Sequence, residues 1–118
     1  MINIFLISII TLFCINTNYI CDNENPLNLS IRNNINGDFI KIEEISEVKP
    51  GSFINIEWNN KSLMLPLSLR RGFLSFSDLK WDWRYEYNKS GEIDQKEATL
   101  YEILGSGKNI EHNCKSSP

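Results

Sequence analysis

Apolar and polar residues alternate one by one through most of the chain after residue 26, a pattern typical of half-buried β-strands. The first alternating run extends from Leu27 to Ile35. It is followed by Asn36-Gly37, the dipeptide that favours a type I′ hairpin turn. A second run then extends from Phe39 to Ile45, so the two runs predict a β-hairpin.

The same alternation predicts five further strands, separated by turn sequences such as Lys49-Pro50-Gly51-Ser52. These strands cover residues 53–58, 63–69, 73–76, 80–87 and 109–114. Pro66 cannot donate a hydrogen bond to a neighbouring strand, which predicts an edge or a bulge at that position. In the run 80–87 the aromatic residues share one face, and we expect this face to lie in the core: Trp81, Trp83, Tyr85 and Tyr87.

Residues 94–105 fit two patterns. A capping-box sequence from Asp94 to Glu97, a helical apolar stripe and Gly105 as a C-terminal cap favour a short helix near residues 95–104. Thr99, Tyr101 and Ile103 also alternate as in a strand. We predict the helix, with strand as the alternative.

Six to seven short strands joined by turns predict an all-β fold, a small antiparallel β-sandwich or barrel with one short helix. About 98 residues remain after an N-terminal segment of about 20, which suits one small domain. We therefore expect a single β domain over residues 21–114 and a disordered tail over residues 115–118.

The segment from Ile2 to Ile15 is apolar, and no charged side chain precedes Asp22. Its length matches the apolar region of a signal peptide and is shorter than the ~20 residues of a typical membrane-spanning helix. We predict that residues 1–20 form an apolar helix that acts as a signal peptide, with a short membrane anchor as the alternative.

The three cysteines also indicate export. Cys14 lies within the apolar segment, which leaves Cys21 and Cys114 as a pair. A disulfide between them would close nearly the whole domain, and the chain-entropy model assigns such a loop about 4.6 kcal/mol. We therefore predict this disulfide and a periplasmic or extracellular location.

Composition argues against several classes of function. The net charge of −3 gives no reason to expect nucleic-acid binding. No spacing of ligands typical of a metal site and no cofactor motif is present, so we expect neither a metal nor a cofactor. His112 is the only histidine, and we expect it to form hydrogen bonds near the disulfide instead of acting in catalysis.

Four basic residues are candidates for a binding surface: Arg70, Arg71, Lys80 and Arg84. Asp78, Asp82 and Glu86 are interleaved with them, so a solvated face of mixed charge is the alternative. Overall, the sequence predicts an exported, non-enzymatic binding or assembly module with an unknown protein or small-molecule partner. Sheet edges are the contact surfaces we expect, since they accept partner strands. A small secreted hydrolase or hydrolase inhibitor, and a membrane-anchored envelope component, are the alternatives.

Overall fold

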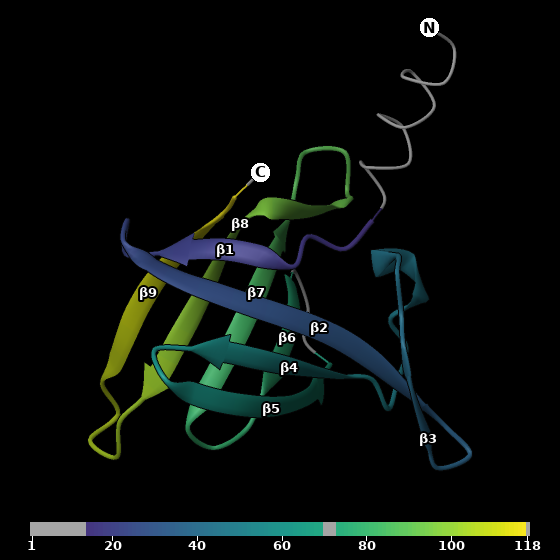
Figure 1. Ribbon diagram of the computed structural model, residues 1–118. Coiled ribbons are helices and arrows are strands. Elements are labelled where there is room, and N and C mark those ends of the chain that lie inside the picture. The colour runs from purple at the N-terminus through teal and green to yellow at the C-terminus, as the bar shows by residue number, and fades with distance from the viewer. Residues whose placement is uncertain (1–13, 70–72, 118) are drawn as a thin grey trace, which may run out of the picture.

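The computed structural model describes residues 14–69 and 73–117 and shows a closed, strongly twisted β-structure (Figure 1). Of the apolar helix predicted over residues 1–20, residues 1–13 lie outside the described residues, and residues 14–20 are not helical, because Asn18 begins a strand. The regular elements are β1 (Asn18–Cys21), β2 (Asn25–Ile35), β3 (Asp38–Lys41), the 3₁₀ turn η1 (Ile45–Glu47), β4 (Phe53–Trp58), β5 (Lys61–Ser68), β6 (Phe73–Ser77), β7 (Trp81–Tyr87), β8 (Ile93–Ile103) and β9 (Asn109–Ser116).

Eight of the nine strands form an antiparallel barrel in the order β1-β9-β8-β7-β6-β5-β4-β2. The barrel closes because β1 pairs with β2 as well as with β9. Closure leaves these eight strands paired on both sides, which removes the exposed edges that open sheets present. The ninth strand, β3, pairs only with the far end of β2 and projects from the barrel (Figure 1).

The core fills the inside of the barrel. Alternate residues along β2 and β4 point inward and are buried, and β5 and β8 also contribute to the core; the buried aliphatic residues of these strands include Leu27, Leu29, Ile31, Ile54, Ile56, Leu65 and Leu100. Aromatic rings occupy the centre: Trp83 meets Tyr19 edge-on at 5.2 Å and Tyr85 at 5.6 Å between ring centroids. The prediction that the aromatic face of residues 80–87 lies in the core is confirmed for Trp81, Trp83 and Tyr85, whereas Tyr87 is exposed.

The all-β class is confirmed, and the barrel alternative is the one that forms. The predicted number of strands, six to seven, is too low. One missing strand is β1, which begins at Asn18 within the segment expected to be the leader. Its four residues are too few to show a clear alternation, and only pairing with β2 and β9 defines them as a strand.

The second missing strand is β8, so the prediction of a short helix near residues 95–104 is wrong. β8 lies between β7 and β9 and pairs with both. These partners satisfy its backbone groups, and pairing between distant segments overrides the local helical preference. Ala98 and Leu100 point into the core at strand spacing, and the Asp94 side chain accepts a hydrogen bond from the Lys96 amide instead of capping a helix.

A bulge in β8 turns one glutamine side chain towards the N-terminal segment. Tyr85 pairs with Ala98, but its neighbour Glu86 pairs with Asp94, so residues 95–97 are extra residues on β8. The buried Gln95 side chain accepts a hydrogen bond from the Asn16 amide at 2.9 Å and donates one to the Cys14 carbonyl at 3.2 Å. The bulge therefore holds residues 14–16 against the barrel.

The two ends of the described chain lie next to each other. β9 continues through Ser116, and the Ser117 amide donates a hydrogen bond to the Asn18 carbonyl at 2.9 Å. Lys115 and Ser116, which belong to the segment expected to be a tail, are thus strand residues. In the part of the chain that the structure describes, no helix has the length and apolar character needed to cross a membrane.

Candidate binding surfaces

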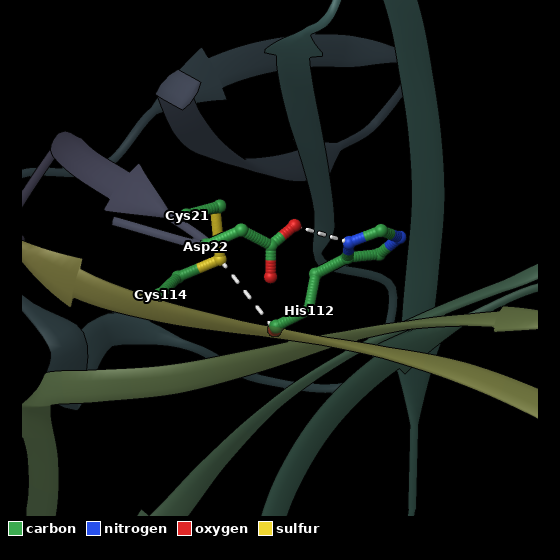
Figure 2. The surroundings of a disulfide bond; sticks show 4 residues. All are labelled: Cys21, Asp22, His112 and Cys114. Carbon is green, nitrogen blue, oxygen red and sulfur yellow. Dashed lines mark hydrogen bonds and ion pairs between the residues drawn. A yellow bond between two sulfur atoms is a disulfide. The ribbon is translucent and has the colours of Figure 1, made fainter. Parts of the chain in front are cut away.

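The predicted disulfide is present and joins the two strands that complete the barrel. Cys21 on β1 and Cys114 on β9 are directly opposite each other, with an S–S distance of 2.07 Å (Figure 2). The two residues are 0% and 1% exposed. A fully buried disulfide is typical of proteins that fold in an oxidising compartment.

His112 lies beside this disulfide and binds an acid (Figure 2). Its Nδ1 is 2.6 Å from Oδ2 of Asp22, which is in the turn between β1 and β2. Its ring also packs on Trp58, with 4.7 Å between ring centroids. The expected hydrogen bond near the disulfide is therefore confirmed. The two groups that the His112 ring contacts are a carboxylate and an indole, and neither is the nucleophile that a catalytic triad requires.

The four basic residues predicted as a binding surface do not form one cluster among the described residues. Arg70 and Arg71 lie outside the described residues. Lys80 is exposed in the turn before β7, and Arg84 lies further along that strand. Asp82 lies between them on the same face of β7 and forms an ion pair with Arg84 at 2.8 Å.

Arg84 is held by groups of the barrel itself. Its guanidinium carbon lies 4.1 Å from the centre of the Phe73 ring and 4.6 Å from that of Tyr101, so it is sandwiched between two aromatic side chains. Asp82 pairs with it and also accepts a hydrogen bond from the Ser75 hydroxyl at 3.0 Å. These contacts give Arg84 a role in joining β6, β7 and β8.

Within the part of the chain that the structure describes, strand β3 has one unpaired edge. All four of its residues are exposed, and among these described residues it pairs with β2 along one side only. The amide of Ile42 donates to Ile31 of β2 at 3.0 Å. Because backbone groups alternate in direction along an antiparallel strand, Phe39 and Lys41 direct their amides and carbonyls to the other side.

The chain itself occupies one end of this edge. The Glu43 carbonyl, which points the same way as those of Phe39 and Lys41, accepts a hydrogen bond from the Ile15 amide at 2.9 Å. Cys14 forms an isolated antiparallel bridge with Glu44 at the same place. A short extended segment of the chain is thus added at one end of this edge, and no residue of 14–69 or 73–117 pairs with the part beside β3.

An apolar cleft lies on the outer face of the barrel, across β2 from this edge. Its volume is about 280 Å³, and it is lined by Phe39, Gly51, Ser52, Phe53, Met64, Pro66 and Leu67. Phe39 reaches across β2 to meet Phe53 edge-on at 5.1 Å. Phe39 is 58% exposed and Met64 65%, so large apolar side chains face solvent here. Grouped exposed apolar residues of this kind mark interaction sites.

Two cations lie beside the cleft. Arg32 on β2 is directly opposite Lys41 on one side and Phe53 on the other, so the three side chains share the outer face. Within the residues that the structure describes, neither Arg32 nor Lys41 forms an ion pair. We call the free edge of β3, the apolar cleft and these two cations the β3 surface.

Sequence reasoning missed the β3 surface. The sequence predicts a strand that begins at Phe39, but alternation does not show which side of a strand remains unpaired. The signal available was an aromatic residue and a lysine, Phe39 and Lys41, on the polar side of a hairpin. Their closeness to Phe53 and Met64 depends on the pairing of β2 with β4 and of β4 with β5.

Fold and site together define a small, disulfide-closed antiparallel β-barrel with one projecting edge strand. Residues 30–114 match the model of a family described as a domain of unknown function (DUF8671), and the chain belongs to this family. No curated protein and no solved structure matches the chain. The matched range contains the whole β3 surface, whereas β1 precedes it.

Proposed function

We propose that this protein is an exported, non-enzymatic binding module that takes up an extended segment of a partner polypeptide at the edge of β3. The observation that carries the proposal is the outer side of β3 at Phe39 and Lys41, with which none of the described residues pairs. An extended segment placed there would form main-chain hydrogen bonds with these two residues and continue the sheet, as in other strand-addition complexes.

Two further features support this function. Phe39 of β3 is an exposed aromatic side chain on the face where alternate side chains of an added strand would point. The barrel that carries β3 is closed and cross-linked by a buried disulfide, which provides a rigid support and fits a location outside the reducing cytosol.

The test uses a labelled seven-residue peptide, Thr-Phe-Thr-Gln-Thr-Phe-Thr, which is uncharged in its side chains and reads the same in both directions. We expect it to bind the wild-type protein in a fluorescence anisotropy titration. Hydrogen exchange of the Phe39 and Lys41 amides should slow on binding, because only these amides of β3 face the added strand.

The decisive variant is Lys41→Pro. It removes an amide donor from the outer side of β3 and leaves the hydrogen bonds to β2 in place, since proline is tolerated on edge strands. We expect at least tenfold weaker binding. Lys89→Pro is the matched control: Lys89 is the second residue of the Asn88–Gly91 turn, where proline fits, and it loses the same charge. Equal binding by the wild-type protein and Lys41→Pro would show that β3 is not the binding edge.

A further inference from the structure

We infer that the segment bound at the β3 surface is acidic, with a carboxylate placed at Lys41 and Arg32 and an apolar side chain against Phe39. This inference rests on the proposed function. It adds the chemistry of the partner to the geometry of strand addition.

The first argument is charge. The chain as a whole carries a net charge of −3, yet Arg32 and Lys41 form an adjacent pair of cations on one face. Asp38, the acid of β3, alternates with Phe39 and so belongs to the opposite face of the strand. Two neighbouring cations without an ion pair among the described residues repel each other and are complementary to a carboxylate.

The second argument is the position of Phe39 relative to the cations. Phe39 and Lys41 are two residues apart on β3, so their side chains lie on the same face, and Arg32 of β2 is directly opposite Lys41. In an added strand, residues two positions apart also lie on the same face. One side chain of the partner would therefore meet Phe39, while the residue two positions away would meet Lys41, with Arg32 one strand further on.

The same cations argue against a second copy of this chain as the occupant. Two β3 strands paired antiparallel across a two-fold axis would place both Lys41 side chains on one face of the combined sheet. The two Arg32 side chains would lie beside them, because each is opposite Lys41 in its own copy. Like charges across a sheet are destabilising, whereas an acidic partner relieves the repulsion.

The test compares two probes, the peptide Thr-Phe-Thr-Glu-Thr-Phe-Thr and its glutamine counterpart described above. They differ in one carboxylate, and their symmetry makes the direction of binding irrelevant. At low ionic strength we expect the glutamate probe to bind about fivefold more tightly than the glutamine probe, and the ratio to fall towards one in high salt.

Substitutions test whether the two cations cause the preference for the glutamate probe. Arg32→Gln and Lys41→Gln should each reduce the ratio, and the double variant should bring it close to one, while the glutamine probe still binds. Lys89→Gln, with the same loss of charge in an exposed turn, should leave the ratio unchanged. A third probe with serine in place of both phenylalanines should bind at least fivefold more weakly than the glutamate probe.

The outcomes are distinguishable. Equal affinity of the glutamate and glutamine probes for the wild-type protein would overturn the acidic preference and leave strand addition intact. Failure of both probes to bind would overturn the proposed function and this inference with it. Sedimentation experiments on the protein alone test the remaining occupant. A dimer that is abolished by Lys41→Pro would show that a second copy occupies the edge, and it would overturn the inference of an acidic partner.

Discussion

At the scale of single residues, two buried tyrosines limit the alkaline pH at which the barrel stays stable. Tyr19 donates a hydrogen bond from its hydroxyl to the Gln95 carbonyl at 2.6 Å, and Tyr85 is completely buried behind Trp83. Burial raises the pKa of Tyr85 to about 12 and raises the pKa of Tyr19 well above the ordinary range. The folded state therefore keeps both phenols neutral.

These shifts predict loss of stability in alkali. In the unfolded chain both tyrosines ionise near pH 10, so the free energy of unfolding stays constant below that pH and falls above it. At pH 11 the expected loss is on the order of 1 kcal/mol for each tyrosine, measured by urea unfolding at pH 8 and pH 11. Tyr85→Phe should remove about half of the difference. If the free energy of unfolding fell equally between pH 8 and pH 11 in Tyr85→Phe and in the wild-type protein, this assignment would be contradicted.

At the scale of elements, β1 is the shortest strand of the barrel and is paired on both sides. It pairs with β2 and β9, and Cys21 is covalently bound to Cys114 of β9. The disulfide links positions separated by 93 residues, so it constrains almost the whole domain in the unfolded state. The stability of barrel closure therefore depends on this cross-link.

Reduction of the disulfide should lower the free energy of unfolding by up to about 4.6 kcal/mol, the value of the chain-entropy model for this loop. The measurement is denaturant unfolding of the Cys21→Ala/Cys114→Ala double variant. Cys14→Ser serves as the control, because Cys14 is a free cysteine. Matching midpoints for the double variant and the wild-type protein would show that the cross-link adds no stability.

At the scale of the whole molecule, the folded unit begins before β1. Residues 14–16 are bound by the Gln95 side chain, the Ile15 amide pairs with the Glu43 carbonyl, and the Thr17 carbonyl accepts from the Leu29 amide at 2.8 Å. The predicted apolar segment ends at Ile15, which is thus already part of the fold. No linker separates this segment from the barrel.

We therefore predict that any processing on export would leave at least residues 14–21 in place. Removal of residues 1–20 would leave Cys21 as the only residue of β1 and break the contacts of Gln95. Intact mass with and without reductant gives both the N-terminus and the state of the disulfide. A folded, disulfide-bonded protein that begins after Cys14 would contradict the prediction, whereas an intact leader would agree with the membrane-anchored alternative.

The sequence by itself determined the all-β class, the hairpin from Leu27, the buried aromatic face of residues 80–87 and the disulfide. Each depends on local alternation, on a turn dipeptide or on the pairing of two remaining cysteines. Tertiary structure decided that β8 is a strand, that β1 closes the barrel and that the edge of β3 stays open. These features arise from hydrogen bonds and contacts between segments far apart in the chain, and local propensity carries no information about which segment pairs with which.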